Sequence, residues 1–276
     1  MNTFFIIIMG GVFILGLVTG VVSNVTSGGA GVFTIFVLAE YGGLSIQKAV
    51  GTVLAASTVF VLVGAITFYQ KREVDSQLSI TLGLTGVAGA FFAARLASSL
   101  QSTAVEHAFG ILTLAVAGYS LFRLGRLRTR TRVSVFEGPI SEVDGSPTEL
   151  SRWRGRDPVA LIAQVGIGTL IGLATGLFGV GGGGLTMAVL LFAFNLRAKL
   201  MLGTSLMASS FRYAGGSLGY LSTGLIDPTM FLILAVGGGI GSLLGARVVI
   251  TRTKDAYVQV IVVLLLLFVS LEFLRK

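Results

Sequence analysis

The chain has 276 residues, of which 54% are hydrophobic and only 12% are charged. An ordinary soluble domain carries about 25% charged residues, so this composition excludes a soluble globular protein. The 20 Lys and Arg exceed the 12 Asp and Glu, giving a net charge of +8, and the absence of cysteine excludes disulfides and thiolate metal sites. Because strand-like alternation is missing as well, the sequence predicts an all-α integral membrane protein.

Ten apolar segments predict membrane helices, measured against the roughly 20 residues that a helix needs to cross hydrocarbon. In the first half of the chain they lie at 4–22, 30–44, 49–69, 77–99 and 105–122. In the second half they lie at 158–178, 182–195, 200–222, 229–250 and 256–274. We expect the first to be a retained span and not a signal peptide, because no positive charge precedes it and no small-residue cleavage site follows.

One long polar stretch, residues 123–157, separates the two sets of five segments. Eight of the 20 Lys and Arg lie between Arg123 and Arg156, which is typical of a cytoplasmic loop facing anionic lipid headgroups and not of a nucleic-acid surface. We therefore expect three parts in a multi-pass protein of the cell membrane. They are an N-terminal membrane repeat (1–122), a basic cytoplasmic linker (123–157) and a C-terminal membrane repeat (158–276).

The two sets of segments are related by an internal repeat. Gly16-Leu-Val-Thr-Gly20 matches Gly172-Leu-Ala-Thr-Gly176 at an offset of 156 residues, and Gly51-Thr52 matches Gly203-Thr204 at an offset of 152. An odd number of segments in each repeat would invert the second repeat relative to the first. Charge placement favours this inverted five-plus-five arrangement, because it puts one group of basic residues on the inner side: Lys71, Arg72, Arg197, Lys199, Arg252 and Lys254.

The segments at 30–44 and 182–195 are too short to cross a core of about 30 Å comfortably. Each follows a glycine-rich break, at Ser27 to Gly31 and at Gly179 to Gly184. Four successive glycines cost a helix about 1 kcal/mol each relative to alanine, so a break is expected there. Paired glycine-interrupted segments in corresponding places indicate the substrate site of an inverted-repeat transporter.

We expect the two breaks to face each other and to bind an anion through backbone N–H groups at the positive helix ends. Arg212 is the one basic residue deep inside a segment, and its fork of donors suits an anion. The alternative is an arginine bonded to the carbonyls of a broken helix. The candidate substrate-binding residues are Asn24, Thr26, Ser27, Gly28, Gly29, Gly181, Gly182, Gly183, Gly184, Thr186 and Arg212.

Further polar residues near the breaks are candidates for lining the pathway: Thr52, Ser57, Thr204, Ser205, Ser209, Arg95 and Arg247. The alternative for the hydroxyls is a bond to their own helix, and for the two arginines a headgroup contact. No carboxylate lies in the middle of a segment, so coupling to H⁺ or Na⁺ stays open. No cofactor, metal or nucleic acid is expected, since His107 is alone and the G-x-G-x-x-G at Gly179 follows a membrane helix and not a strand.

Three motifs together resemble a known family. They are Gly176-Leu-Phe-Gly-Val-Gly-Gly-Gly-Gly184, Leu202-Gly-Thr-Ser-Leu-Met207, and Gly238-x-x-Gly241 with Gly245-Ala-Arg247. The combination resembles the TauE/SafE family of sulfite exporters, also described as toluene sulfonate uptake permease-like proteins. The N-terminal copy departs from the pattern, because polar residues replace the compact glycine run at Val21 to Ser27. The resemblance implies a membrane carrier for sulfite, organosulfonates or related small sulfur-containing anions.

Two other functions stay open from the sequence, namely an anion channel of the same fold and a membrane scaffold that transports nothing. An enzyme is not expected, because the sequence offers no nucleophile with a base and no paired carboxylates within a segment. The particular anion, the direction of transport and the oligomeric state are not predicted.

Overall fold

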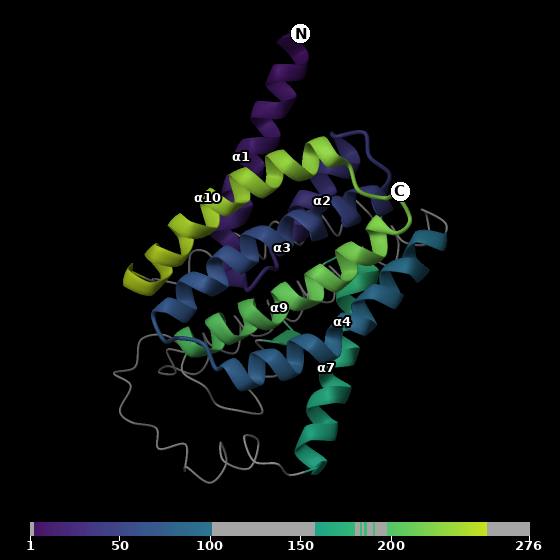
Figure 1. Cartoon of the computed structure of the whole chain (residues 1–276). Helices are drawn as coiled ribbons and strands as arrows, with labels where there is room; N and C mark the ends of the chain where they lie inside the picture. Colours follow the sequence, from purple (N-terminus) through teal and green to yellow (C-terminus); the bar gives the residue numbers. More distant parts are fainter. Residues whose placement is uncertain are drawn as a thin grey trace, which may run out of the picture.

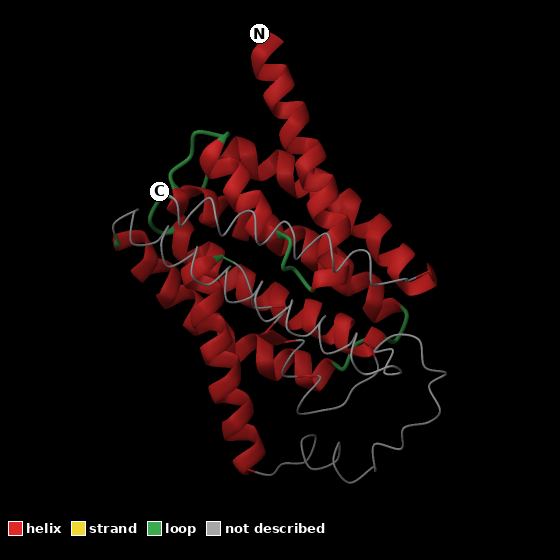
Figure 2. Ribbon diagram, turned by 180° about the vertical axis from the view of Figure 1, so that it is seen from behind, coloured by secondary structure: helices red, strands yellow, loops and turns green. Residues whose placement is uncertain are grey.

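The computed structural model describes residues 3–100, 158–179, 183, 185, 186, 190 and 198–252. These residues form helices joined by short turns, and the described ranges contain no strand (Figures 1 and 2). In chain order the helices are α1 (Thr3–Thr26), α2 (Gly31–Glu40), α3 (Ile46–Gln70), α4 (Ser76–Ser99), α7 (Pro158–Phe178), α9 (Ala198–Leu221) and α10 (Pro228–Arg252). The expected segments at 105–122 and 256–274, the linker 123–157 and most of 182–195 lie outside the described residues.

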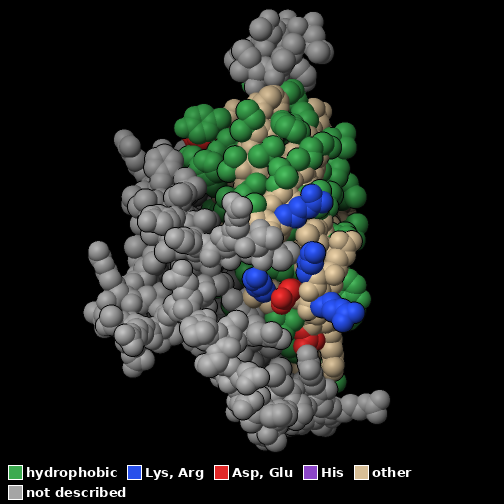
Figure 3. Space-filling model, turned by 90° about the vertical axis from the view of Figure 1, so that its left-hand side faces the viewer, with side chains coloured by type: hydrophobic (Ala, Val, Ile, Leu, Met, Phe, Trp, Pro, Cys, Tyr) green, Lys and Arg blue, Asp and Glu red, His purple; other side chains and the backbone are tan. Residues whose placement is uncertain are grey.

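Four of these helices, α3, α4, α7 and α10, are long and apolar enough to cross a membrane. Their outer faces carry large apolar side chains: Leu62 is 40% exposed, Leu84 53% and Leu170 67%. An exposed apolar surface of this extent is unfavourable in water and suits a lipid environment. On the face drawn in Figure 3 the hydrophobic side chains cover the upper part, while Lys, Arg and acidic side chains gather lower down. The chain is therefore a helical, multi-pass membrane protein.

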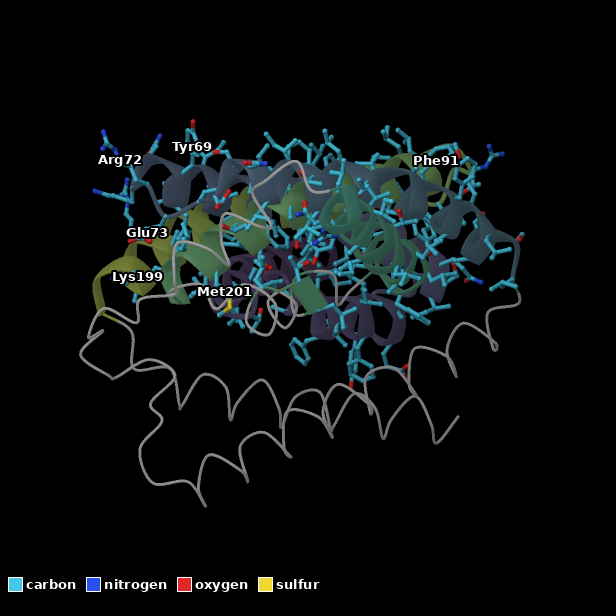
Figure 4. The ribbon with its side chains drawn as sticks, turned by 90° about the horizontal axis from the view of Figure 1, so that it is seen from below. Tyr69, Arg72, Glu73, Phe91, Lys199 and Met201 are labelled. Atoms are coloured by element: carbon cyan, nitrogen blue, oxygen red, sulfur yellow. The ribbon has the colours of Figure 1, made fainter. Side chains whose placement is uncertain are left out.

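Four helices lie side by side in the order α10, α3, α9 and α4, with α1 packed on α10 and α7 packed on α4 (Figure 1). α3 and α9 run in opposite directions, because the start of each contacts the turn that follows the other. Gly203 lies against the carbonyl oxygen of Glu73, and Gly51 lies against that of Leu225. Arg72, Glu73 and Lys199 therefore share one end of the bundle, as the charge pattern predicts, and Figure 4 shows them away from Phe91.

The first two helices form a hairpin that enters the bundle and turns back halfway. α1 runs parallel to α10, and its chain turns at Ser27 and Gly28, whose φ angles of 53° and 89° are left-handed. α2 then starts at Gly31, near Val53 and Ser57 in the middle of α3, and ends beside the start of α3. With 10 residues, α2 is about 15 Å long at 1.5 Å per residue and does not cross the bundle.

The hairpin bears on the expected arrangement of the basic residues, because α2 does not cross the bundle. If the segments at 30–44 and 182–195 were both re-entrant and the other eight crossed, Lys199 would lie on the side opposite to Lys71. Because α1 and α2 enter and leave together, the number of crossings changes by two, and Lys71 and Lys199 stay at one end. Lys48 lies at the opposite end, where its ammonium is 3.2 Å from the Asp227 carboxylate.

Glycines let the helices of the two halves approach until their backbones touch. A Cβ at Gly20 would overlap the carbonyl oxygen of Gly238, and a Cβ at Gly172 would overlap that of Gly86. Gly86 and Gly238 are 152 residues apart, so the contact of α1 with α10 has a counterpart in the contact of α7 with α4. Small residues allow such close van der Waals packing in lipid, where no hydrophobic effect drives helices together.

We predict that Gly172→Ala destabilises the protein while Gly239→Ala does not. A methyl group at residue 172 would collide with the Gly86 carbonyl, and overpacking of this kind costs about 1–3 kcal/mol. At Gly239 no atom of the described residues lies within 4 Å of a new Cβ, so the better helix propensity of alanine is the main effect. Thermal unfolding of the purified protein in detergent measures both, and equal melting temperatures for the two variants would contradict the packing.

Candidate functional site

The two glycine-rich breaks meet in the middle of the bundle. Gly183 lies so close to Ser27 that a Cβ there would overlap the Ser27 carbonyl oxygen. The Ser27 hydroxyl donates to the Ser205 hydroxyl at 2.5 Å, and the Ser205 hydroxyl donates to the Gly183 carbonyl at 2.8 Å. Three predicted site residues thus form one buried hydrogen-bonded chain, to which the Tyr213 hydroxyl adds a bond of 3.1 Å to the Gly28 carbonyl.

Arg212 lies next to this chain and is completely buried. Its guanidinium donates to the Leu82 carbonyl of α4 at 3.0 Å, to the Thr186 hydroxyl at 2.6 Å and to the Ser209 hydroxyl at 3.0 Å. Both sequence alternatives are represented, since one bond goes to a helix carbonyl and two go to predicted site residues. These three partners are neutral groups, and together they hold the guanidinium in place.

The two halves of the chain differ at the position of Arg212. The offset of 152 residues places Phe60 at the corresponding point of α3, and Phe60 packs on Gly238 as Arg212 packs on Gly86. The frame of the site is therefore duplicated, but its charge is present in one half only. Our sequence analysis missed Phe60 and Tyr213, although applying the repeat offset to Arg212 would have found Phe60.

Thr52 and Thr204 fasten the two halves at opposite ends of the bundle. The Thr52 hydroxyl accepts from the Asp227 N–H at 2.9 Å, and the Thr204 hydroxyl accepts from the Asp75 N–H at 2.9 Å. Each aspartate also caps the following helix, with Asp75 accepting from the Leu78 N–H at 3.2 Å and Asp227 from the Met230 N–H at 3.1 Å. We call these paired contacts the threonine fasteners.

The other predicted residues lie apart from Arg212. Asn24 and Thr26 donate to carbonyls of their own helix, at Gly20 and Val22, and Ser57 lies near the start of α2. Arg95 and Arg247 are exposed near the ends of α4 and α10, and the Arg95 guanidinium lies 6.0 Å from the centre of the Phe91 ring. Gly29 follows the hairpin turn, and Gly181, Gly182 and Gly184 lie outside the described residues.

All four acidic residues in the described ranges lie at or beyond a helix end: Glu40, Glu73, Asp75 and Asp227. No group of three or more His, Cys, Asp or Glu within those ranges is arranged to hold a metal ion. A buried arginine where two broken helices meet inside a membrane bundle is instead typical of the substrate site of a membrane transporter.

Comparison with known proteins agrees with this class. The chain matches the family described as "Sulfite exporter TauE/SafE" over residues 12–273, and it belongs to that family. It is 25% identical over 235 residues to the probable membrane transporter protein YdhB of Bacillus subtilis, covering 85% of this chain and 86% of the relative. It is 22% identical over 262 residues to the probable membrane transporter protein YunE of the same organism, covering 91% and 93%.

A probable membrane transporter protein of Xylella fastidiosa is 27% identical over 239 residues, covering 85% of this chain and 81% of the relative. No solved structure matches the chain significantly. The protein is thus a membrane transporter and not an enzyme, and the family resemblance drawn from the three sequence motifs is confirmed.

We predict that the ion pair between Lys48 and Asp227, which lies beside the Thr52 contact, stabilises the protein less in acid. Burial raises the pKa of Asp227, but the Met230 N–H and the Lys48 ammonium outweigh it, and the net pKa lies below the ordinary 3.8. The charged form therefore stabilises the fold at pH above 3.8, and this contribution is lost as the pH falls through the lowered pKa. Asp227→Asn keeps a helix cap but removes the charge, so it should cost about 0.2–1 kcal/mol near neutral pH.

Melting temperatures of the wild type and of Asp227→Asn, measured across this pH range, test the prediction. The difference between them should shrink as the pH falls below 3.8. Lys48→Met provides the matched control, since the two substitutions remove the same ion pair and their effects should not add. A difference that stays constant in acid would assign the effect to the cap alone.

Proposed function

We propose that the protein carries a small sulfur-containing anion, such as sulfite or an organosulfonate, across the cell membrane and binds it beside Arg212. The family description supports sulfite or a chemically related substrate. The observation that carries the proposal is the burial of the Arg212 guanidinium among hydroxyls where the breaks meet. An arginine at such depth is costly in a membrane, and its planar fork of donors fits the oxygens of a sulfonate group.

The remaining contacts to the anion come from the two breaks. The donors are the backbone N–H groups of Gly181 to Gly184 and the Thr186 hydroxyl, together with the partial positive charge at the start of the short helices. The N–H groups of Gly28 and Gly29 already donate to the Ser23 and Thr26 carbonyls. Ser205 and Ser209 lie on the same face of α9 as Arg212 and line the approach. Asn24 and Thr26 spend their donors on helix carbonyls, so we leave them out of the anion site.

We further propose that the chain consists of two inverted five-segment repeats that expose the site alternately to the two sides. The reciprocal contacts of Thr52 with Asp227 and of Thr204 with Asp75 support this, because a two-fold axis in the membrane plane would exchange one contact for the other. In this arrangement the basic loop 123–157 lies in the cytoplasm, at the end that carries Lys71, Arg72 and Lys199.

An anion channel of the same fold is the second candidate, since glycine backbones also line pores. The tight contact of Ser27 with Gly183 in the middle of the bundle favours a carrier over an open pore. Flux into proteoliposomes separates the two, because a carrier saturates and is accelerated by substrate on the far side. A transport-inactive scaffold predicts that no anion stabilises the protein.

We predict that sulfur oxyanions raise the melting temperature of the wild-type protein in detergent and that Arg212→Lys loses most of this rise. Ligands that bind the folded state stabilise it by mass action. The lysine keeps a positive charge but not the planar fork, and losing a charge-assisted bond worth about 1.5–3 kcal/mol weakens binding by roughly 10- to 150-fold. Sulfite, sulfate, thiosulfate, taurine and sulfoacetate should be screened against carboxylates of matched size.

Arg247→Lys is the matched control, because Arg247 is exposed on α10 and far along the chain from the breaks. It should respond to the anions as the wild type does. If Arg212→Lys does not fold, Ser209→Ala removes one bond to the guanidinium and should weaken the response by a smaller factor. The proposal is contradicted if no sulfur anion stabilises the wild type, or if Arg212→Lys is stabilised as much as the wild type.

A further inference from the structure

Two neighbouring residues near the end of α1, Ser23 and Asn24, each bury a polar atom that finds no partner. Asn24 is 0% exposed and Ser23 is 1% exposed. No described residue donates a hydrogen bond to the Asn24 Oδ1, and the Ser23 hydroxyl bonds to none. An unsatisfied buried polar group costs about 1–3 kcal/mol, so two in one helical turn need an explanation.

The orientation of the Asn24 amide is fixed by its nitrogen. Nδ2 donates to the Gly20 carbonyl at 2.9 Å, to the Ser242 carbonyl at 3.0 Å and to the Ser242 hydroxyl at 3.2 Å. The oxygen is therefore the atom that faces α3, where a Cβ at Gly64 would overlap it. That same Cβ position is 2.9 Å from the Ser242 Oγ, so both oxygens lie against Gly64.

The corresponding place in the other half is apolar. The offset of 152 residues turns Gly64 into Gly216, where a Cβ would meet Leu54 carbons at 3.1 Å and 3.8 Å and the Gly176 Cα at 3.7 Å. The same offset turns Ser242 into Ala90. The oxygen pair is thus a feature of one half only, as Arg212 is a feature of the other.

Ser23 and Asn24 belong to an extra helical turn in α1. From Gly20 to the left-handed Ser27 there are seven steps along the chain, whereas from Gly176 to the left-handed Gly179 there are three. The four additional residues amount to about one turn of helix and account for the change of offset from 156 to 152. They contain Ser23 and Asn24, so the extra turn brings in the two unsatisfied groups.

The chemistry of this place is that of a cation site. With the Asn24 amide nitrogen used up, its Oδ1 is an acceptor only, which repels an oxyanion and attracts a metal cation, and the Ser23 and Ser242 hydroxyls can turn lone pairs toward the same ion. Ser23 and Asn24 also lie in the last turns of α1, where the helix dipole is negative, and the ends of broken helices coordinate Na⁺ in other membrane carriers. Amide and hydroxyl oxygens do not take up a proton near neutral pH, which excludes H⁺ as the ion held here.

We propose that the Asn24 Oδ1 and the Ser242 Oγ, with the Ser23 hydroxyl in the same turn, bind a Na⁺ ion between α1, α10 and α3. Binding of the ion by the isolated protein is independent of the proposed function. Its coupling to transport rests on that function and follows from the hairpin. A cation near Asn24 orders the end of α1, and three residues on, Ser27 bonds to Ser205 in the chain beside Arg212.

The test is thermal unfolding of the purified full chain in detergent, without any sulfur anion. NaCl is titrated against choline chloride at constant total chloride and ionic strength. The wild type should be stabilised by Na⁺ in a saturable way. Gly64→Ala should lose this response, because its methyl group would collide with the Asn24 Oδ1 and the Ser242 Oγ and displace them. Gly216→Ala at the corresponding apolar place should keep it.

Ser242→Ala is the milder variant in case Gly64→Ala does not fold, and it should need about tenfold more Na⁺ for the same shift, equivalent to about 1.4 kcal/mol. Equal melting of the wild type in NaCl and choline chloride would overturn the proposal. So would a Na⁺ response that Ser242→Ala and Gly64→Ala both retain. A wild type that responds to sulfite but not to Na⁺ rejects the cation site alone, and a wild type that responds to Na⁺ but not to sulfite rejects the anion site alone.

Discussion

Backbone polar groups inside a membrane must find partners within the protein, and this constraint governs how the α1–α2 hairpin is built. A turn at Ser27 and Gly28 in the middle of the bilayer leaves N–H and C=O groups that lipid cannot satisfy, at a cost of several kcal/mol each. The turn is tolerated because α3, α9 and the second break surround it, the Tyr213 hydroxyl donates to the Gly28 carbonyl, and the Gly28 N–H donates to the Ser23 carbonyl. The glycine contacts of α1 with α10 and of α7 with α4 let the surrounding helices come close enough to the turn to bond with it.

The two halves of the chain share the glycines and threonines that shape the centre of the bundle, but they differ in the residues that give it charge and polarity. Arg212 stands where the first half has Phe60, and Ser242 stands where the first half has Ala90, while the glycines and threonines that shape the frame are common to both halves. A positive charge on one side of the breaks and neutral oxygens on the other give the centre a polarity that a perfectly symmetric repeat would lack. Such polarity favours ligands of opposite charge at two separate places.

Much of the fold follows from sequence, because apolar length, glycine position and basic residues are local properties. α7 ends at Phe178 as the apolar segment does, and Arg72 and Lys199 share one end as their charge predicts. The sequence could not predict which way α2 runs inside the bundle or where buried side chains point. The return of α2 depends on where Gly31 meets α3, and the fate of the Asn24 amide depends on Ser242, which is 218 residues away. Long-range contacts of this kind leave no local pattern.

The large sequence separation of these contacts also affects how the protein is inserted into the membrane. α1 finds its packing partner in α10, and the threonine fasteners join residues 175 and 129 positions apart. Among the described residues, the glycine-lined faces of α1 and α4 pack on α10 and α7 of the second half, so these contacts form only after the second half has been synthesised. The bundle closes around the hairpin only after α10 has been synthesised, so biogenesis depends on holding an incomplete half in the bilayer until the second arrives.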